Sequence, residues 1–162
     1  MALACAVLLA PVGNVAIPLP PSAASGPDAD ASKRILARLL PNVYRAFEFP
    51  MESAAYDRLA LSVTGDTLAE VYLEHRRAVR MEERGGARAR VETVEVIEVG
   101  SVEPGSSGGF IADAIWTVGG TVTHFGHRHF RQNRYEARLD IVPVEGYWKL
   151  RSIDVFDEKR LR

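Results

Sequence analysis

The sequence predicts an α+β domain in which N-terminal helices pack on a long, curved, four-stranded antiparallel meander. Apolar residues recur at helical spacing between residues 31 and 79, and the period changes toward two after Gly86. Four segments with strand-like alternation then follow one another along the chain. Helices first and strands afterwards is the element order of an α+β domain rather than of a parallel α/β fold.

The composition is that of a soluble globular chain with one domain and a tail. Its 162 residues include 20 basic and 21 acidic side chains, so the net charge of −1 offers no field that would attract nucleic acid. We therefore expect no nucleic-acid partner. The one cysteine, Cys5, lies outside the expected domain. This excludes an intrachain disulfide, a dithiol redox motif and a thiolate zinc cage.

The first 24 residues are typical of a targeting segment rather than of a folded core. Residues 2–20 carry no charge, and the run ALACAVLLA has the length of the apolar part of a signal peptide. Several prolines would interrupt a spanning helix, and the usual positive flank is missing. We expect a signal peptide or membrane anchor over 1–24, a linker over 25–32 and a single α+β domain over 33–158. The location is then extracytoplasmic, on the periplasmic side, with the protein anchored or secreted. A hydrophobic disordered tail is the alternative.

Three helices are expected before the sheet. The first starts at Ala31 and is kinked before Pro41. The second follows Pro50 and ends at Gly65, and the third begins at a capping box formed by Thr67 and Glu70. The third helix stops at residues 85–86, a glycine pair suited to a left-handed cap.

The hydrophobic pattern fixes the register of the central hairpin. Strands are predicted over 91–99, 110–118, 135–144 and 147–156. A two-residue turn at Phe125-Gly126 places Trp116 opposite Tyr135 and keeps apolar residues on one face of the hairpin. A turn at residues 119–120 would instead bring histidines opposite core positions. The first register is preferred, and the long strands it implies should bend at that glycine pair.

Three of the four histidines lie in the stretch THFGHRHF, at this turn. The preferred register sets His124 across from His127, with His129 two residues further along the same face. Neutral imidazoles at such separations are ligands for zinc, copper or nickel. The fourth ligand could be water, Asn133, or His75 from the apolar stripe of the third helix.

Two other interpretations of this stretch stay open. Histidine is common at half-exposed hairpin tips, and Arg131 on the same face disfavours a cation. A sheet end with His, Arg, Asn and Tyr also suits a small-anion or acid-base site. In that case His127 or His129 would transfer the proton, and Tyr135 or Asn133 would orient the substrate.

The order of helices and meander, ending in EGYWKLRSIDVFDE, resembles the nuclear transport factor 2-like, or SnoaL-like, superfamily. The Gly-x-Trp-Lys-Leu turn and last strand carry most of the resemblance, which covers roughly residues 30–158. It implies a cone-like fold that encloses a pocket. Members include isomerases, dehydratases, hydrolases and non-catalytic binding or assembly domains, some of them extracytoplasmic parts of bacterial membrane machinery. No clear short strand stands between the second and third helices, which leaves a cystatin-like arrangement as the alternative.

Two functions are therefore expected. The first is a non-catalytic, exported or membrane-tethered domain that binds a partner protein or a small-molecule ligand, with or without the histidine metal site. The partner expected is a membrane or a membrane protein. The second is a small pocket enzyme of the isomerase, dehydratase or hydrolase type. No nucleophile constellation accompanies the histidines, and this favours the first.

Overall fold

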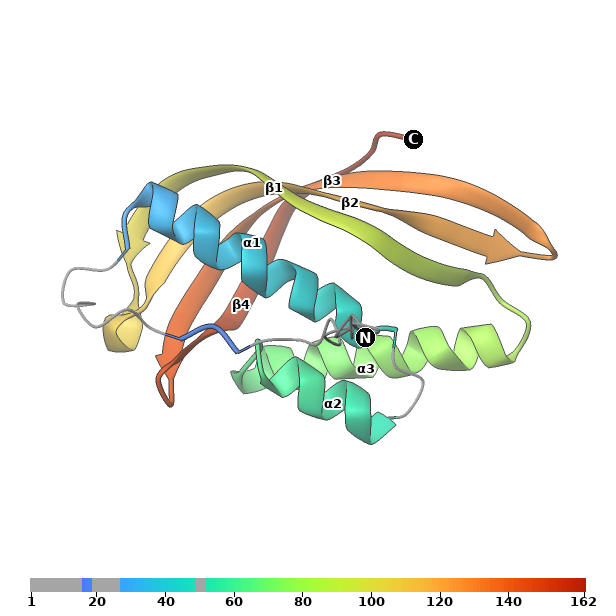
Figure 1. The fold of residues 1–162 in the computed structure, drawn as a ribbon, viewed down its shortest axis with the longest axis horizontal. Coiled ribbons are helices and arrows are strands. Elements are labelled where there is room, and N and C mark those ends of the chain that lie inside the picture. The colour runs from blue at the N-terminus through green and yellow to red at the C-terminus, as the bar shows by residue number, and fades with distance from the viewer. Residues whose placement is uncertain (1–15, 19–26, 49–51) are drawn as a thin grey trace, which may run out of the picture.

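The computed structural model describes residues 16–18, 27–48 and 52–162 of the chain. In this part, three helices precede a four-stranded sheet (Figure 1). The elements are α1 (Ala29–Ala46), α2 (Glu52–Ala60), α3 (Gly65–Glu83), β1 (Arg88–Pro104), the short 3-10 turn η2 (Ser106–Gly108), β2 (Phe110–His124), β3 (His127–Val144) and β4 (Tyr147–Arg160). All neighbouring strands are antiparallel, in the order β1-β2-β3-β4. The predicted α+β meander is confirmed at this level.

The core lies between α1 and the sheet, which arches over the helices in Figure 1. Leu36, Leu39 and Leu40 form the buried side of α1 and pack against inward residues of the strands. Burying a leucine side chain contributes about 1.5–3 kcal/mol, so this stripe holds α1 to the sheet. At the helix start, Asp28 accepts a hydrogen bond from the amide of Ala31 at 2.7 Å and so satisfies one of the free N–H groups. The helix continues through Pro41, beyond the predicted kink.

The junction between α2 and α3 differs from the prediction. The second helix ends at Ala60 rather than near Gly65, and Val63 forms a single parallel bridge with Leu150 of β4. The amide of Thr64 donates to the Leu150 carbonyl at 2.9 Å, which holds this segment extended. Gly65 then opens α3 with a φ of +66°, a conformation that glycine adopts at little cost.

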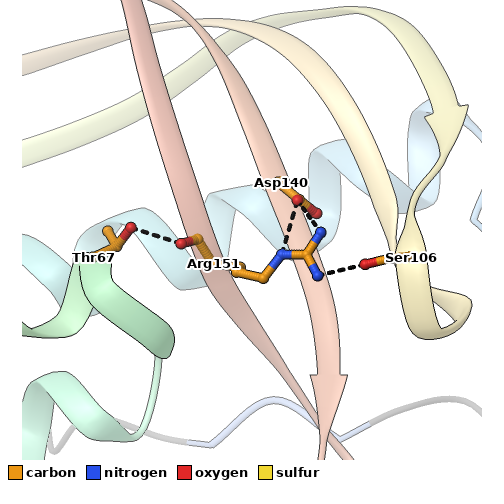
Figure 2. A network of polar contacts seen from close by, with 4 residues as sticks. All are labelled: Thr67, Ser106, Asp140 and Arg151. Carbon is orange, nitrogen blue, oxygen red and sulfur yellow. Dashed lines mark hydrogen bonds and ion pairs between the residues drawn. The ribbon is translucent and has the colours of Figure 1, made fainter.

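The predicted capping box at Thr67 is wrong because the N-cap residue of α3 is Thr64, three positions earlier. Thr67 lies inside the helix, and its hydroxyl donates to the carbonyl oxygen of Arg151 at 2.6 Å. Figure 2 shows that the Arg151 guanidinium also binds the Asp140 carboxylate and the hydroxyl of Ser106. This network joins the start of α3 and the turn η2 to strands β3 and β4.

The register of the β2–β3 hairpin is confirmed. His124 pairs with His127 and Trp116 pairs with Tyr135, as the turn at Phe125-Gly126 requires. Both turn residues have positive φ, +47° and +79°, which is the backbone of a type I′ hairpin turn.

The register of β1 against β2 shifts opposite the glycine pair at residues 119–120, between Val91 and Thr93. A Cβ atom on Gly120 would lie only 2.2 Å from the carbonyl oxygen of Arg90. A side chain at this position would therefore push β1 away, and glycine lets the two strands approach each other here.

A short piece of the expected leader packs against the domain. Ile17 is buried in the core, its carbonyl accepts a hydrogen bond from the Trp148 amide at 3.0 Å, and Pro18 forms a bridge with Tyr147. The remainder of the expected signal or anchor lies outside the described residues. Most of the expected linker over 25–32 is described, and its second half is not a linker, because α1 already begins at Ala29. Among the helices that the structure describes, none has the length and apolar character needed to cross a membrane.

Candidate functional site on the inner face of β3

Strand β3 presents a row of polar side chains on its inner face, toward the β2–β3 turn. Successive side chains of a strand alternate between faces, so every second residue joins the row. Its members are His127, His129, Arg131, Asn133 and Tyr135. The next inward positions, Ala137 and beyond, are buried apolar core. The same face therefore changes from core to polar site along one strand, and Figure 1 shows the hairpin extending past the end of α1.

Hydrogen bonds connect the inner members of this row. Arg131 donates through Nε to Asn133 Oδ1 at 3.1 Å, and Asn133 Nδ2 donates to Glu158 Oε1 of β4 at 2.7 Å. Tyr135 Oη accepts from Asn133 Nδ2 and donates to Glu158 Oε1, both at 3.2 Å. Asn133 is buried, so these bonds satisfy an amide that would otherwise be costly to remove from water.

The network rests on an aromatic layer. The Tyr135 ring stacks on Trp116 with centroids 5.5 Å apart, and the Trp116 indole N–H donates to Tyr44 Oη of α1 at 3.1 Å. Burial raises the pKa of Tyr44, and it also raises that of Tyr135, where the nearby Glu158 carboxylate adds to the effect. Both phenols are therefore neutral at ordinary pH and act as hydrogen-bonding groups.

A shallow pocket of about 280 Å³ lies beside this network. Its lining comes from the start of β1, the outer half of β2 and the polar row: Ala89, Arg90, Val91, Val118, Gly120, Thr121, Val122, Arg131, Asn133 and Tyr135. Its walls are mostly apolar, with a few convergent polar groups, which is the usual character of a small-ligand site.

The three hairpin histidines are neighbours at the outer end of the row. The ring centroids of His124 and His129 are 5.4 Å apart, and those of His127 and His129 are 6.5 Å apart. Even so, the described part of the chain holds no group of three His, Cys, Asp or Glu side chains placed to bind a metal ion. The rings therefore do not form a ligand set as they stand, and the metal site stays a prediction.

His75 lies elsewhere. It is buried in α3, and its ring meets Phe47 edge to face at 5.3 Å. The structure therefore brings together the three hairpin histidines without this one.

The proposed acid-base residues are only partly brought together. Asn133 and Tyr135 line the pocket, whereas His127 and His129 are exposed and do not line it. The lining thus holds the expected orienting residues without the expected proton-transfer residues.

Three further residues belong to the site that the sequence did not point to. Glu158 lies beyond the predicted end of the last strand at residue 156, and Arg90 lies before the predicted start of the first strand at residue 91. Tyr44 falls on the apolar stripe of α1, where its hydroxyl gives no periodic signal. Extending each strand to match its neighbour across the long hairpin would have included the first two.

No family model and no curated protein matches this chain. Solved structures do resemble it. The crystal structure of the intermembrane space region of the chloroplast protein ARC6 aligns with a TM-score of 0.58 at 15% identity, covering 80% of this chain and 96% of that one. A solution structure of a de novo β-sheet design covers 82% of this chain and 88% of its own, at 19% identity and a TM-score of 0.42, too low to support any argument. The chain is thus similar in fold to the ARC6 intermembrane space region.

Proposed function

We propose that this chain is a non-catalytic binding domain that works outside the cytoplasm, exported or tethered to a membrane. It holds a membrane-protein partner or a small ligand on the inner face of its sheet, in the part next to the β2–β3 turn. The observation that carries the proposal is the polar row of β3. Inward positions that would normally extend the core instead hold Arg131, Asn133 and Tyr135 beside an open pocket.

The extracytoplasmic location is supported by the first part of the sequence. Residues 2–20 carry no charge, as expected of a signal or anchor segment. The similar ARC6 structure is that of an intermembrane space region, a location stated for that protein.

We also propose that the arrangement is of the cone-like type implied by the nuclear transport factor 2-like resemblance, rather than cystatin-like. The sequence shows no clear short strand between the second and third helices, and this is where it departs from the resemblance. Val63 occupies that place, and its single parallel bridge to Leu150 acts as a minimal strand against β4. Together with the pocket on the inner face, this pairing supports the cone-like alternative.

Photo-crosslinking in native cells tests the proposed binding face. A photoreactive residue at Val122 would point to the inner face, and one at Thr123 would point to the outer face of the same strand. We expect a crosslinked adduct from Val122 and none from the matched control. An adduct from Thr123 alone would contradict the proposal. So would fractionation that finds the native protein in the cytosol with residues 1–24 still attached.

The predicted metal site has a direct test. Isothermal titration with zinc, copper and nickel near neutral pH is expected to give saturable uptake, which should weaken in acid because a protonated imidazole does not bind a metal ion. The paired change His127→Ala/His129→Ala should remove it, while Arg128→Ala on the opposite face should leave it intact. No heat above dilution for any of these metals would make these histidines ordinary hairpin residues.

A further inference from the structure

The lining of the pocket beside the polar row includes arginines and no carboxylate, while the Glu158 carboxylate accepts hydrogen bonds from two lining residues, Asn133 and Tyr135. Of its lining residues, Arg90 and Arg131 are the charged ones, from β1 and β3 respectively. Both arginines are exposed, so an anion can reach their guanidinium groups from solvent.

Arg90 and Arg131 differ from several other arginines of the sheet. Arg134, Arg138 and Arg151 each contact a carboxylate, from Asp157, Asp113 and Asp140 respectively. Within the described residues, neither Arg90 nor Arg131 lies within ion-pair distance of a carboxylate. Among the described residues Arg128 and Arg160 also lack an ion pair, so what sets Arg131 apart is its place in the lining of the pocket.

Arg131 is also held in place. Its Nε donates to Asn133, and Asn133 is itself buried and fixed by Glu158 and Tyr135. A guanidinium has five N–H donors, so four remain on its two terminal nitrogens after this bond. Because the guanidinium is already held in place, a ligand that binds it would cost less side-chain conformational entropy.

We propose that this pocket binds a carboxylate carried on a small apolar body. This inference rests on the proposed binding function and names its ligand class. The Arg131 guanidinium matches the planar, two-oxygen geometry of a carboxylate. Of the two arginines only Arg131 lies on the inner face, since Arg90 pairs with Thr121 of the outer face. Val91, Val118 and Val122 provide the surface for the apolar part. The carboxylate belongs either to a free acid or to the end of a peptide chain.

Amide chemical-shift titration of the full-length protein tests this proposal with benzoate as the probe. Benzyl alcohol, similar in shape but uncharged, is the matched ligand control. We expect benzoate to shift the amides that line the pocket and to bind at least about tenfold more tightly than benzyl alcohol, since a charged hydrogen-bonded pair is lost in the neutral compound. Arg131→Gln should weaken benzoate by a similar factor. Arg134→Gln, which removes the same charge from the opposite face of the strand, should not.

A second pair of probes separates the two sources of the carboxylate. N-acetylphenylalanine binding more tightly than benzoate supports a peptide end, and the reverse order supports a free acid. Equal binding of benzoate and benzyl alcohol, or unchanged binding to Arg131→Gln, overturns the proposal. If Arg131→Gln does not fold by circular dichroism, Arg131→Lys serves as the second variant, and it should also weaken benzoate because lysine lacks the paired donors of a guanidinium. Failure here with a positive Val122 crosslink would refute the carboxylate and leave the binding function in place.

Discussion

Trp116 is fixed on two sides, by the Tyr135 ring and by the hydroxyl of Tyr44, and it is almost fully buried. We expect Trp116→Ala to lower the free energy of unfolding by about 3–5 kcal/mol, because a large side chain leaves a cavity that the layer cannot fill. Urea denaturation followed by circular dichroism measures the change. Trp116→Phe should cost less, since a ring still stacks on Tyr135. A loss below about 1 kcal/mol for the alanine variant would contradict the packing described here.

The two phenols of this layer should resist ionisation. The pKa values of Tyr44 and Tyr135 are raised above the ordinary 10.0, so the folded state favours the neutral phenol. Their contribution to stability is therefore complete below pH 10 and is lost as the pH rises from there toward the folded-state values. Titration by tyrosinate absorbance should show two of the five tyrosines ionising late, together with unfolding. In Tyr44→Phe one late step should disappear, whereas five tyrosines that all titrate near 10 would refute the burial of this layer.

Among the elements, the segment around Ile17 is the one most open to a direct test. Ile17 is buried against the start of β4 and its carbonyl pairs with Trp148. Ile17→Ala should reduce the free energy of unfolding by about 2 kcal/mol, at the lower end of values for a buried isoleucine. Thermal unfolding checks this, with Pro18→Ala as a control because Pro18 is exposed. Equal melting temperatures for both variants would mean that this segment adds nothing to the fold.

The strands could be predicted from the sequence, but the junction of α2 and α3 could not. The hairpin at Phe125-Gly126 can be recognised from local sequence, because apolar and polar residues alternate on both sides of a glycine that accepts positive φ. The end of α2 is set by Leu150, which is distant in sequence and holds the backbone of Thr64 extended. Thr67 matches a capping box, yet its hydroxyl bonds to the Arg151 carbonyl instead. Local patterns carry no information about such partners.

The candidate site divides in the same way. Strand alternation alone puts His127, Arg131 and Tyr135 on one face, and the observed register agrees. Which of these residues shape a pocket depends on β1 and β4, since Arg90 and Glu158 come from strand ends that the pattern did not reach. Only the folded sheet shows that Asn133 links Arg131 to Glu158.

At the scale of the whole molecule, the sheet is used twice. The half beside α1 forms one side of the core, and the half that extends past the end of α1 in Figure 1 is the one to which the polar row and the pocket belong. A substitution in the half that extends past α1 should therefore affect binding more than stability. A substitution in the half that packs against α1 should affect stability more than binding. The similarity to the ARC6 region concerns this arrangement of helices and sheet alone, because at 15% identity no site residue can be assigned from one chain to the other.

The strand order has a consequence for the speed of folding. Every strand pairs with the one next to it in sequence, and two tight turns, at Phe125-Gly126 and Glu145-Gly146, both have the positive φ that a type I′ turn needs. Pairing can begin at these turns and proceed along each hairpin without closing a long loop, which favours rapid folding for a sheet protein. The bridge from Pro18 to Tyr147 spans most of the chain and should form last. In stopped-flow experiments Gly126→Val should slow folding, whereas Ile17→Ala should mainly accelerate unfolding. The segment around Ile17 would then determine how slowly the folded domain unfolds rather than how quickly it folds.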